Sequence, residues 1–377
     1  MAILVDLPPE LVLHIVSFST RLTTLYEKNL LPRFEWDHLT KLIPDLPSIN
    51  ALSQADSYLH CTLNDSLYDL CAMNKILGRL SFLYAAKLEL ADVLERLAAA
   101  GVDVDFEVCF ERRCCTLLDL ASAMNLRVTV LKLLQIYGTD MAAKVHARDY
   151  FSNLSPLDYA ACRGNLDVVR MLAPIPNPPP SSSEISWSPT QHLSIALIQA
   201  VKGGHRAVCE YLLSQGADVN YIDYSDHYRE CSSPLFHATI CAEFDLQITQ
   251  LLLSAGANPN IAEGAILLGA ARSSRRLDML EALFAGGMDL HVRDRFYQHN
   301  VFEGCRDVTA MRFFLEHGVD PNVRNREGRT PLHYVYSLVD LDRAHQLGDL
   351  LLQFGALPDI TDKEGITPID ILHRKAF

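Results

Sequence analysis

The sequence predicts an all-α protein built as a linear array of helix pairs, with a separate helical segment in front of the array. Two observations lead to this prediction. Apolar stretches that end in two or three aliphatic residues and a short step to Gly-Ala-Asp, or a variant of it, recur along the chain, most clearly over 211–218 and 251–258. Ser-Pro or Thr-Pro pairs stand before other stretches of helical pattern. Self-similarity at a fixed period indicates a repeat architecture.

The composition is that of a folded protein with an acidic surface. Hydrophobic residues make up 49% of the 377 residues and charged residues 21%, which is ordinary for a chain that buries a core. The formal net charge is −13, and an acidic surface repels phosphates, so we expect no nucleic-acid partner.

The chain is expected in the cytoplasm, the nucleus or both. Its first residues have no basic flank, and Asp6, Pro8 and Pro9 interrupt the apolar stretch, unlike a secretory signal. No apolar run approaches the roughly 20 residues that span a bilayer, so no membrane association is expected. We therefore expect the ten cysteines to be reduced.

The first expected element is an amphipathic helix over 7–18. Prolines start it, and Leu11, Ile15 and Phe18 fall on one face. Residues 49–59 and 64–68 predict further helices, and residues 19–48 are expected to form an insertion between the two halves.

These N-terminal helices resemble an F-box, the short helical module that docks onto the Skp-type adaptor of cullin-RING ubiquitin ligases. The resemblance implies adaptor-binding residues at Leu7, Pro8, Glu10, Leu11, Ile15 and Leu52. An F-box has only a few residues where this chain has 19–48. The alternative is that the 7–18 helix caps the apolar end of the array, since repeat arrays need capping elements at their ends.

The array itself is predicted over 76–377, after the F-box-like segment of 1–75. Glycines close the repeated stretches at positions 101, 138, 216, 256, 287, 318 and 355, with steps of 37, 78, 40, 31, 31 and 37. The step of 78 contains two units, because 164–172 has the helical pattern without its final glycine. Glycine suits the left-handed position that ends a helix.

The start of each unit carries the second signature. A Ser or Thr hydroxyl can cap free backbone N–H groups, and proline fits the first helical turn. Such starts stand at Ser155-Pro156, Ser233-Pro234, Thr330-Pro331 and Thr367-Pro368. The unit between Gly287 and Gly318 has none.

The period near 33 and the Thr330-Pro331-Leu332-His333 opening resemble ankyrin repeats. The resemblance covers about residues 80–377 and implies about eight units, a truncated last unit and hairpin fingers between units. It also implies a protein partner bound on the concave face and the fingers.

Two long connections interrupt the array. Residues 174–189 hold six of the 18 prolines together with Trp187, and they are either a docking segment or a tolerated surface insertion. The finger at 221–230 is rich in residue types that dominate binding hot spots. These candidates for partner binding are Tyr221, Tyr224, His227, Tyr228 and Arg229. The alternative is that they pack against a neighbouring finger.

The sequence contains no signature of catalysis, metal binding or a cofactor. It has no Cys-x-x-Cys pair, and Cys109, Cys114 and Cys115 lack the paired spacing of zinc ligands. They are interpreted as buried structural thiols. We therefore expect a non-enzymatic protein without cofactors.

The leading hypothesis is the substrate-recognition subunit of a Skp–cullin–F-box type ubiquitin ligase. The alternative is an ankyrin scaffold or adaptor without a role in ubiquitination.

Overall fold

The computed structural model describes most of the chain from residue 68 onward and two short strands before it. The described residues are 20–24, 40–44, 68–69, 71–73, 75–110, 113–148, 153–175, 190–223, 232–240, 246–261, 264–272, 277–293, 300–303 and 305–375. They belong to two compact units, residues 1–192 and 193–377, and each unit is described by itself.

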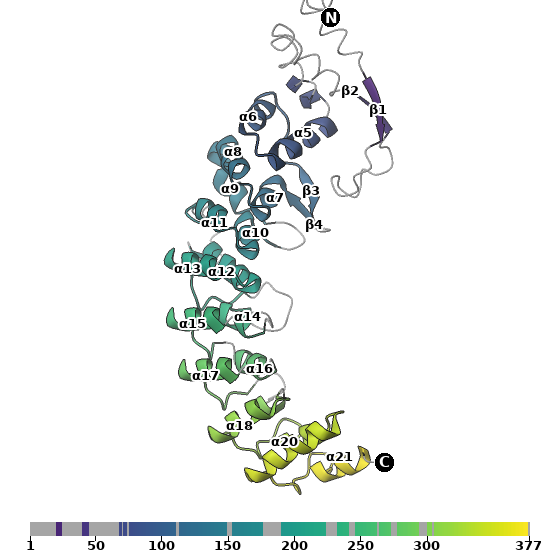
Figure 1. Ribbon diagram of the computed structural model, residues 1–377, viewed down its shortest axis with the longest axis vertical. Helices are drawn as coiled ribbons and strands as arrows, with labels where there is room; N and C mark the ends of the chain where they lie inside the picture. Colours follow the sequence, from purple (N-terminus) through teal and green to yellow (C-terminus); the bar gives the residue numbers. More distant parts are fainter. Residues whose placement is uncertain are drawn as a thin grey trace, which may run out of the picture. The chain divides into compact units, whose positions relative to one another are not determined.

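The first unit contains helix pairs and two small antiparallel hairpins (Figure 1). Its helices are α5 (Lys75–Lys87), α6 (Ala91–Ala99), α7 (Leu117–Ala123), α8 (Arg127–Tyr137), α9 (Met141–Val145), α10 (Pro156–Arg163) and α11 (Leu166–Leu172), with the 3₁₀ turn η2 (Gly138–Asp140). Its hairpins are β1 (Thr20–Thr24) with β2 (Thr40–Pro44) and β3 (Glu107–Phe110) with β4 (Arg113–Thr116).

The second unit is a further series of helix pairs. Its elements are α12 (Gln191–Gly203), which begins at the end of the first unit, α13 (Arg206–Ser214), α14 (Pro234–Ile240), α15 (Leu246–Ser254), α16 (Ala265–Arg272), α17 (Leu277–Ala285), η3 (Val301–Glu303), α18 (Val308–Glu316), α19 (Pro331–Tyr336), α20 (Leu341–Gln353) and α21 (Pro368–Lys375).

Within each unit, the first helix of a pair packs on the first helix of the next pair, and the second on the second. The pairs α7 with α10 and α6 with α8 show this in the first unit, as do α14 with α16 and α15 with α17 in the second. The core lies between these layers. Its second-helix members are buried side chains about one turn apart, among them Leu94, Leu97, Val130, Leu133, Val168, Leu172, Val208, Leu212, Leu252, Leu283, Phe314 and Leu351. Burying one such side chain contributes about 2 kcal/mol.

All four Ser/Thr-Pro starts lie at the beginning of a helix, as the sequence predicts. The hydroxyl of Ser155 accepts from the Asp158 N–H at 3.3 Å, and that of Thr367 from the Asp370 N–H at 3.2 Å. Ser233 caps α14 through the Phe236 N–H at 3.2 Å. Thr116 caps α7 in the same way without a following proline, so a search for Ser/Thr-Pro alone misses it.

The repeat glycines have positive φ angles, as expected, from +51° at Gly138 to +92° at Gly216. Gly138 differs from the others: its ψ of −114° lies outside the left-handed helical region, and the chain continues from it into η2 and α9.

The chain departs from regular helix pairs at two places. The unit without a Ser/Thr-Pro start opens with the short η3 turn, whose Phe302 N–H bonds to the Asn300 side chain at 2.9 Å. Within the expected 19–48 insertion, β1 pairs with β2 from Thr20 opposite Pro44 to Thr24 opposite Thr40. Residues 25–39 separate these strands, a connection too long for the short turn signals that reveal a hairpin in a sequence. The predicted helices at 7–18 and 49–59, and the predicted helix at 64–68 except for its last residue, lie outside the described residues.

Candidate protein-interaction surface

Most of the residues proposed for binding lie outside the described part of the chain. This holds for the adaptor-binding set, Leu7, Pro8, Glu10, Leu11, Ile15 and Leu52, and for Trp187, Tyr224, His227, Tyr228 and Arg229. Tyr221 is described: it is half-buried, and its N–H donates to the Asp218 carbonyl at 3.2 Å. The structure therefore defines the bases of the fingers, on which the proposed contact residues depend.

The base of the tyrosine-rich finger is closed by a short bridge. Asp223 and Ser232 pair as antiparallel neighbours, and the Asp223 N–H donates to the Ser232 carbonyl at 2.8 Å. The buried Ser232 hydroxyl lies 2.7 Å from Nε2 of His237 on α14. Both ends of the finger are thus held where they leave the helical stack.

His237 is electrically neutral in this position. Burial and then the charge of Lys202 lower the pKa of His237 to about 3, against the opposing influence of Asp223. A neutral imidazole can share a hydrogen bond with a hydroxyl without leaving a charge buried. The contact between Ser232 and His237 is accordingly a structural link.

Three asparagines connect the bases of successive fingers in the second unit. Asn220 donates from Nδ2 to the Gly256 carbonyl at 3.0 Å, and its Oδ1 accepts from the Asn258 N–H at 2.7 Å. Asn260 makes the same two bonds to the next repeat, both at 2.9 Å. Asn322 also makes them, at 2.9 Å from its Nδ2 and at 2.8 Å to its Oδ1. We call these three residues the asparagine clamps. A single asparagine side chain thus donates a hydrogen bond to a carbonyl at the end of a helix and accepts one from an N–H in a turn.

The sequence contains a signal for the clamps that the prediction did not use. Each clamp stands four residues after a repeat glycine, as Asn220 follows Gly216. At the equivalent place after Gly287 stands His291, an exposed residue. Among the hydrogen bonds of the described residues, His291 takes part only through its backbone N–H, to Asp289 Oδ1 at 2.9 Å. The link between this repeat and the next therefore lacks a clamp.

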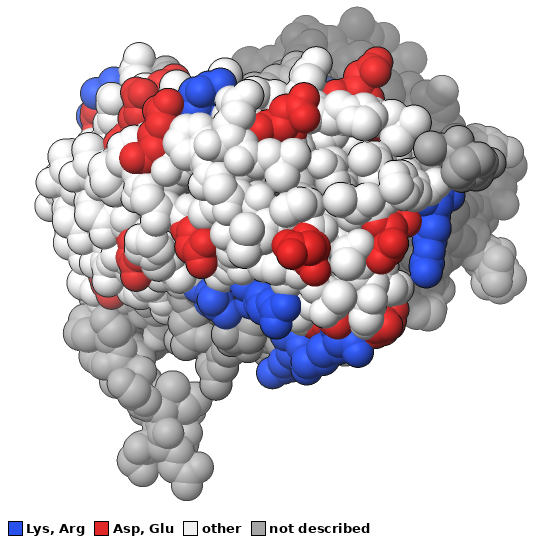
Figure 2. All heavy atoms as spheres, turned by 90° about the horizontal axis from the view of Figure 1, so that it is seen from below, with Lys and Arg blue, Asp and Glu red and all other residues white. Residues whose placement is uncertain are grey.

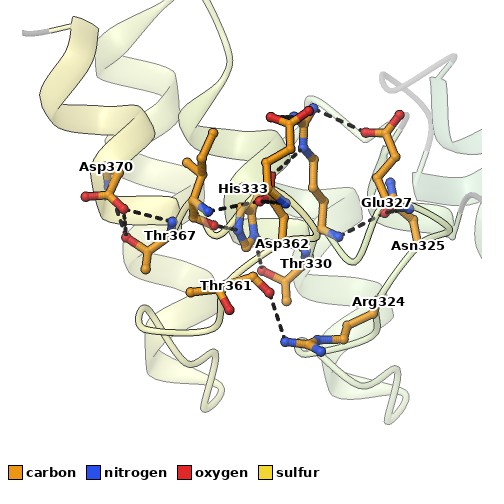
Figure 3. Close-up of polar contacts among 12 residues, drawn as sticks. Arg324, Asn325, Glu327, Thr330, His333, Thr361, Asp362, Thr367 and Asp370 are labelled. Atoms are coloured by element: carbon orange, nitrogen blue, oxygen red, sulfur yellow. Dashed lines mark hydrogen bonds and ion pairs between the residues drawn. The ribbon is translucent and has the colours of Figure 1, made fainter.

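The last two fingers are joined by a charged network (Figure 3). Arg329 donates from Nε to Asp362 Oδ2 at 3.1 Å, and its guanidinium lies 3.3 Å from Glu327 and 3.9 Å from Glu364. Asp362 is 1% exposed, whereas the two glutamates are 67% and 70% exposed. The ion pair of Arg329 with Asp362 is therefore the part of the network that stabilises the contact between the two fingers, because exposed ion pairs contribute little to stability.

Backbone donors complete the surroundings of Asp362. Its Oδ1 accepts from the N–H groups of Glu364 at 2.9 Å and Ile366 at 3.0 Å. Burial alone would raise the pKa of Asp362, but these N–H groups and Arg329 outweigh it and hold the pKa below its ordinary value. The carboxylate is thus fixed in its charged form at the base of the last finger.

His333 supplies the second connection between these repeats. Its Nδ1 lies 3.0 Å from the Thr330 N–H, so Nδ1 is the acceptor and Nε2 donates to the Ile366 carbonyl at 3.0 Å. Burial lowers the pKa of His333, although the Ile366 carbonyl opposes the change. Arg324 adds a bond from its guanidinium to the Thr361 carbonyl at 3.0 Å. The Thr-Pro-Leu-His opening thus caps its own helix and holds the next finger.

The first unit has a finger of regular hairpin form, β3–β4. Below it, Lys144 Nζ lies 2.7 Å from Asp105 Oδ2, which ties the start of this finger to the next repeat. Val108 and Cys115, which lie opposite each other, are both 2% exposed. The hairpin therefore packs one face against the repeats. The buried position expected for Cys115 is confirmed.

Charge on the visible face of Figure 2 is dispersed. Most Asp and Glu side chains on this face are separated by uncharged surface, and Lys and Arg lie along the lower edge, at the upper left and at the right of the view. Within the described residues, no group of three or more His, Cys, Asp or Glu side chains could hold a metal ion. No helix among them is long and apolar enough to cross a membrane. The described surface offers firmly held fingers, an arrangement suited to contacts with another macromolecule.

The clearest similarities of the chain are to ankyrin repeats. A family model of ankyrin repeats in three copies matches residues 118–223, and a second, of ankyrin repeats in many copies, matches residues 306–337. No F-box family model matches the chain.

Individual proteins match parts of the chain. A protein of Rickettsia bellii (strain RML369-C) described as an ankyrin repeat protein is 34% identical over 108 residues, which cover 27% of this chain and 31% of that protein. The mitochondrial disaggregase of Bos taurus is 28% identical over 148 residues, which cover 37% of this chain and 20% of that protein. The chain thus spans less than a third of the length of these relatives.

Among solved structures, the human ASB11 ankyrin repeat domain matches with a TM-score of 0.44 and 22% identity, over 59% of this chain and 90% of that chain. The matches to the two family models confirm the predicted ankyrin repeats, and the helices of the described residues confirm the mostly helical fold.

Proposed function

Because the chain contains ankyrin repeats, which indicate a protein–protein interaction module, we propose that it holds a protein partner on its fingers and the adjoining concave face. The observation that carries this proposal is the fixation of the finger bases by the asparagine clamps and by the pair of Arg329 and Asp362. Fingers that are already ordered lose little conformational freedom when a partner binds. Their tips can then supply contacts without disturbing the stack.

The finger at 221–230 is the proposed main contact. Tyr221, Tyr224, His227, Tyr228 and Arg229 are the residue types that contribute most at protein interfaces. The bridge between Asp223 and Ser232 supports this role, because it holds both ends of the finger. The partner would bury aromatic rings between finger and target.

The test is a double substitution, Tyr224→Ala with Tyr228→Ala. Proteins captured by the full-length chain would be quantified by mass spectrometry, and their affinity measured once purified. We expect affinity to fall by about tenfold or more, since removal of a hot-spot aromatic costs about 2 kcal/mol, with an unchanged thermal midpoint.

Tyr84→Ala is the matched control, since Tyr84 is 65% exposed on α5 and outside the finger. Equal loss in the control, or no loss in the double variant, would remove the finger from the interface. Trp187→Ala in the same assay decides whether the proline-rich connection also docks or is a tolerated insertion.

The finer proposal is that the chain recruits its partner to a Skp–cullin–F-box type ubiquitin ligase. The support is the F-box-like pattern of residues 7–18 and 49–68 in the sequence. Catalysis would belong to the partner subunits, and the repeats would select the protein to be modified. The cytoplasm and the nucleus are the compartments proposed for this task.

Direct binding to a purified Skp-type adaptor tests the ligase role. Leu11→Asp with Ile15→Asp places charges on the predicted apolar face and should abolish binding, whereas Ser17→Asp on another face of the same helix should preserve it. Absence of adaptor binding by the unmodified chain would rule out the ligase role and leave the general binding role untouched.

One observation favours the second candidate, a scaffold whose N-terminal segment is a cap. The segment just before the array already packs on the first repeat: Cys71 is buried and lies 3.4 Å from the Ser81 hydroxyl, and the Arg96 guanidinium lies over the Tyr68 ring at 5.9 Å. Removing residues 1–66 leaves these contacts, and removing 1–75 deletes them. If the segment that makes these contacts is the cap, the array stays stable after the shorter deletion and the first repeats are exposed by the longer one. If residues 1–75 are a separate docking module, the array stays stable after both deletions, as measured by thermal unfolding.

A further inference from the structure

The first unit carries a patch of exposed apolar side chains on its second-helix side, which we call the α8 patch. Figure 1 shows α6, α8 and α11 on one side of this unit, with α7, α10 and the β3–β4 finger on the other. Large apolar side chains on α8 and on the turns that precede α6 and α8 are 39% to 49% exposed. The patch consists of Leu88, Leu90, Met124, Val128 and Leu131.

Contacts between two neighbouring repeats make the patch continuous. Glu89 lies between the two leucines that precede α6, and its carboxylate accepts from the N–H of Val128 at 2.8 Å. Leu131 follows Val128 by one helical turn, so both side chains lie on the same face of α8. Met124 directly follows α7, as Leu88 directly follows α5.

The outward positions of α8 differ from those of the other second helices. Each second helix has two buried residues one turn apart, such as Val130 and Leu133 on α8, and the residue after the first of them is exposed. On α8 this residue is Leu131. One turn earlier, Val128 stands where α6, α11 and α17 have aspartate. In the described part of the chain, the other second helices have a charged or amide side chain at the place of Leu131, namely Glu95, Arg170, Glu210, Gln250, Glu281, Arg312 and Asp349. An apolar pair at otherwise polar places indicates a surface that a partner covers.

The size of the patch fits one helix of a partner better than a second copy of the chain. Stable interfaces between folded proteins have about 20–30 residues on each side, whereas the patch has five. A single amphipathic helix binds through a few apolar side chains that are one turn apart. The expected occupant is therefore one helix that lies along α8.

Charged groups at the rim of the patch select the kind of helix. On the side of α6 the rim has three carboxylates, Glu89, Asp92 and Glu95, against the ammonium groups of Lys87 and Lys132. Lys132 Nζ lies 2.8 Å from Glu95, whose side chain stays 66% exposed. This side of the rim thus has an excess of negative charge.

The opposite side of the rim has no such excess. There Arg127 lies 3.0 Å from Asp167, and the exposed Arg170 adds a positive charge. Complementary charge steers binding and fixes the orientation of a partner. A helix with basic side chains along one flank of its apolar stripe is therefore oriented with that flank toward α6.

We propose that the α8 patch binds an amphipathic helix of a protein partner, with its apolar stripe on Val128 and Leu131 and its lysine or arginine side chains toward Asp92 and Glu95. This surface belongs to the second helices and is separate from the fingers. It can therefore be occupied while a partner is bound to the fingers.

The probe for the test is a fluorescent synthetic peptide of leucine and lysine, about 18 residues long, which is about five helical turns. Its leucines are three and four positions apart, so that they form one stripe. Fluorescence anisotropy with the full chain measures the Kd. We expect saturable one-to-one binding, and at least about tenfold weaker binding of a scrambled peptide of the same composition, which has the charge but no apolar stripe.

Val128→Gln with Leu131→Gln tests the apolar contact. It gives α8 the two glutamines that α15 has at the equivalent places, so the repeat is expected to fold. Affinity for the peptide should fall at least about tenfold, because the apolar area buried on binding is lost. The matched control, Leu277→Gln with Leu352→Gln, removes exposed apolar side chains of α17 and α20 and should leave the affinity unchanged.

Asp92→Asn with Glu95→Gln tests the charged flank. Affinity should fall by about threefold at low salt and by less at high salt, because salt screens exposed charges. Asp278→Asn with Glu281→Gln changes the equivalent places of α17 and removes the same charge from the chain. This control should bind the peptide with unchanged affinity.

A photoreactive group on the peptide locates the contact in the unmodified chain, should a variant fail to fold, and cross-links are expected on α6 and α8. The proposal is overturned if the ordered and scrambled peptides bind equally, if a control variant loses as much affinity as its counterpart, or if the cross-links fall on other helices. A dimer in analytical ultracentrifugation that Val128→Gln with Leu131→Gln dissociates would also overturn it, since a second copy would then cover the patch.

Discussion

At the scale of single residues, backbone conformation decides which positions tolerate a side chain. The repeat glycine Gly216 has φ of +92°, and a Cβ atom added there would meet nothing within 4 Å. Any cost of a substitution therefore comes from the backbone alone. The structure separates this effect from steric crowding.

We expect Gly216→Ala to lower the free energy of unfolding by about 1–2 kcal/mol, because an L-residue pays this much in the left-handed region. Denaturation in urea, followed by circular dichroism, measures the change. The preceding residue Gln215 has φ of −86°, so Gln215→Ala is the matched control and should change stability by less than about 0.5 kcal/mol. Equal costs for the two variants would contradict the conformational explanation.

His237 predicts a dependence of stability on pH. Its pKa in the folded chain, about 3, lies below the unfolded value of about 6.5. Between these values the unfolded chain binds a proton that the folded chain does not, so stability is present above pH 6.5 and is lost as pH falls. The limiting slope is about 1.4 kcal/mol per pH unit.

His237→Gln isolates this contribution, because glutamine cannot titrate but can still bond to the Ser232 hydroxyl. We expect the stability advantage of the unmodified chain over the variant to shrink by up to about 2 kcal/mol between pH 7 and pH 5. Urea titrations at both pH values measure it. A difference that does not depend on pH would show that His237 has the same pKa in the folded chain as in the unfolded chain.

Local capping could be predicted from the sequence, whereas contacts between fingers could not. Ser155 and Thr367 cap helices that start at the next residue, and a pattern of three or four letters contains that information. The pair of Arg329 and Asp362 joins residues 33 positions apart. Their proximity depends on how two repeats stack, which no short pattern encodes.

At the scale of structural elements, the asparagine clamps suggest how stacking is reinforced. Three of four successive finger bases have the clamp, and His291 stands at the third of the four positions. His291→Asn is expected to supply the two missing bonds, to the Gly318 carbonyl and the Asp320 N–H. Two additional bonds at a partly exposed site should contribute about 1 kcal/mol.

Amide hydrogen exchange gives a local measurement for this substitution. The Asp320 N–H should exchange more slowly in His291→Asn than in the unmodified chain, and the urea midpoint should rise. His291→Ala removes the imidazole without adding an amide and serves as control. If the two variants behave alike, position 291 does not lie within reach of the next repeat.

Element prediction succeeded where the repeat period applies and failed where it does not. The helices follow from apolar spacing and from glycine and capping signals. The β1–β2 hairpin was missed, because a long connection separates its strands. Hairpin fingers between repeats were expected from the resemblance to ankyrin repeats, whereas the position and register of β3–β4 were not predicted.

At the scale of the whole molecule, the stacking of repeats brings together residues that are about one repeat period apart in the sequence. The contacts between fingers join residues that are 27 to 38 positions apart in the sequence. These contacts are the asparagine clamps, the ion pair of Arg329 with Asp362 and the hydrogen bond of His333 with Ile366. The order of helix pairs could therefore be predicted from the glycine positions. The segment before the array has no period, so its partner in space could not be predicted from the sequence.

Position within the array should decide how far a local defect spreads. Asp158 and Asp370 form the same capping box, in which the carboxylate accepts from the N–H and from the hydroxyl of the residue three positions before it. The distances to the N–H and the hydroxyl are 2.9 and 2.8 Å for Asp158. For Asp370 they are 2.9 and 2.7 Å. Asp158 is fully buried, lies 3.5 Å from the Arg148 guanidinium and belongs to α10, which contacts α7 and α11. Asp370 is exposed on α21, which contacts α19.

Substituting both aspartates by asparagine compares one motif at two sites. Asp158→Asn should cost about 2–3 kcal/mol, because it weakens charge-assisted bonds in a buried site, and it should speed amide exchange through α7, α10 and α11. Asp370→Asn should cost clearly less stability, because Asp370 is exposed, and it should speed exchange within α21 alone, because stability in a linear array passes only between neighbours. Urea unfolding and hydrogen exchange read out both effects. If Asp370→Asn lowered protection as far as α15, coupling in the second unit would extend well beyond nearest neighbours.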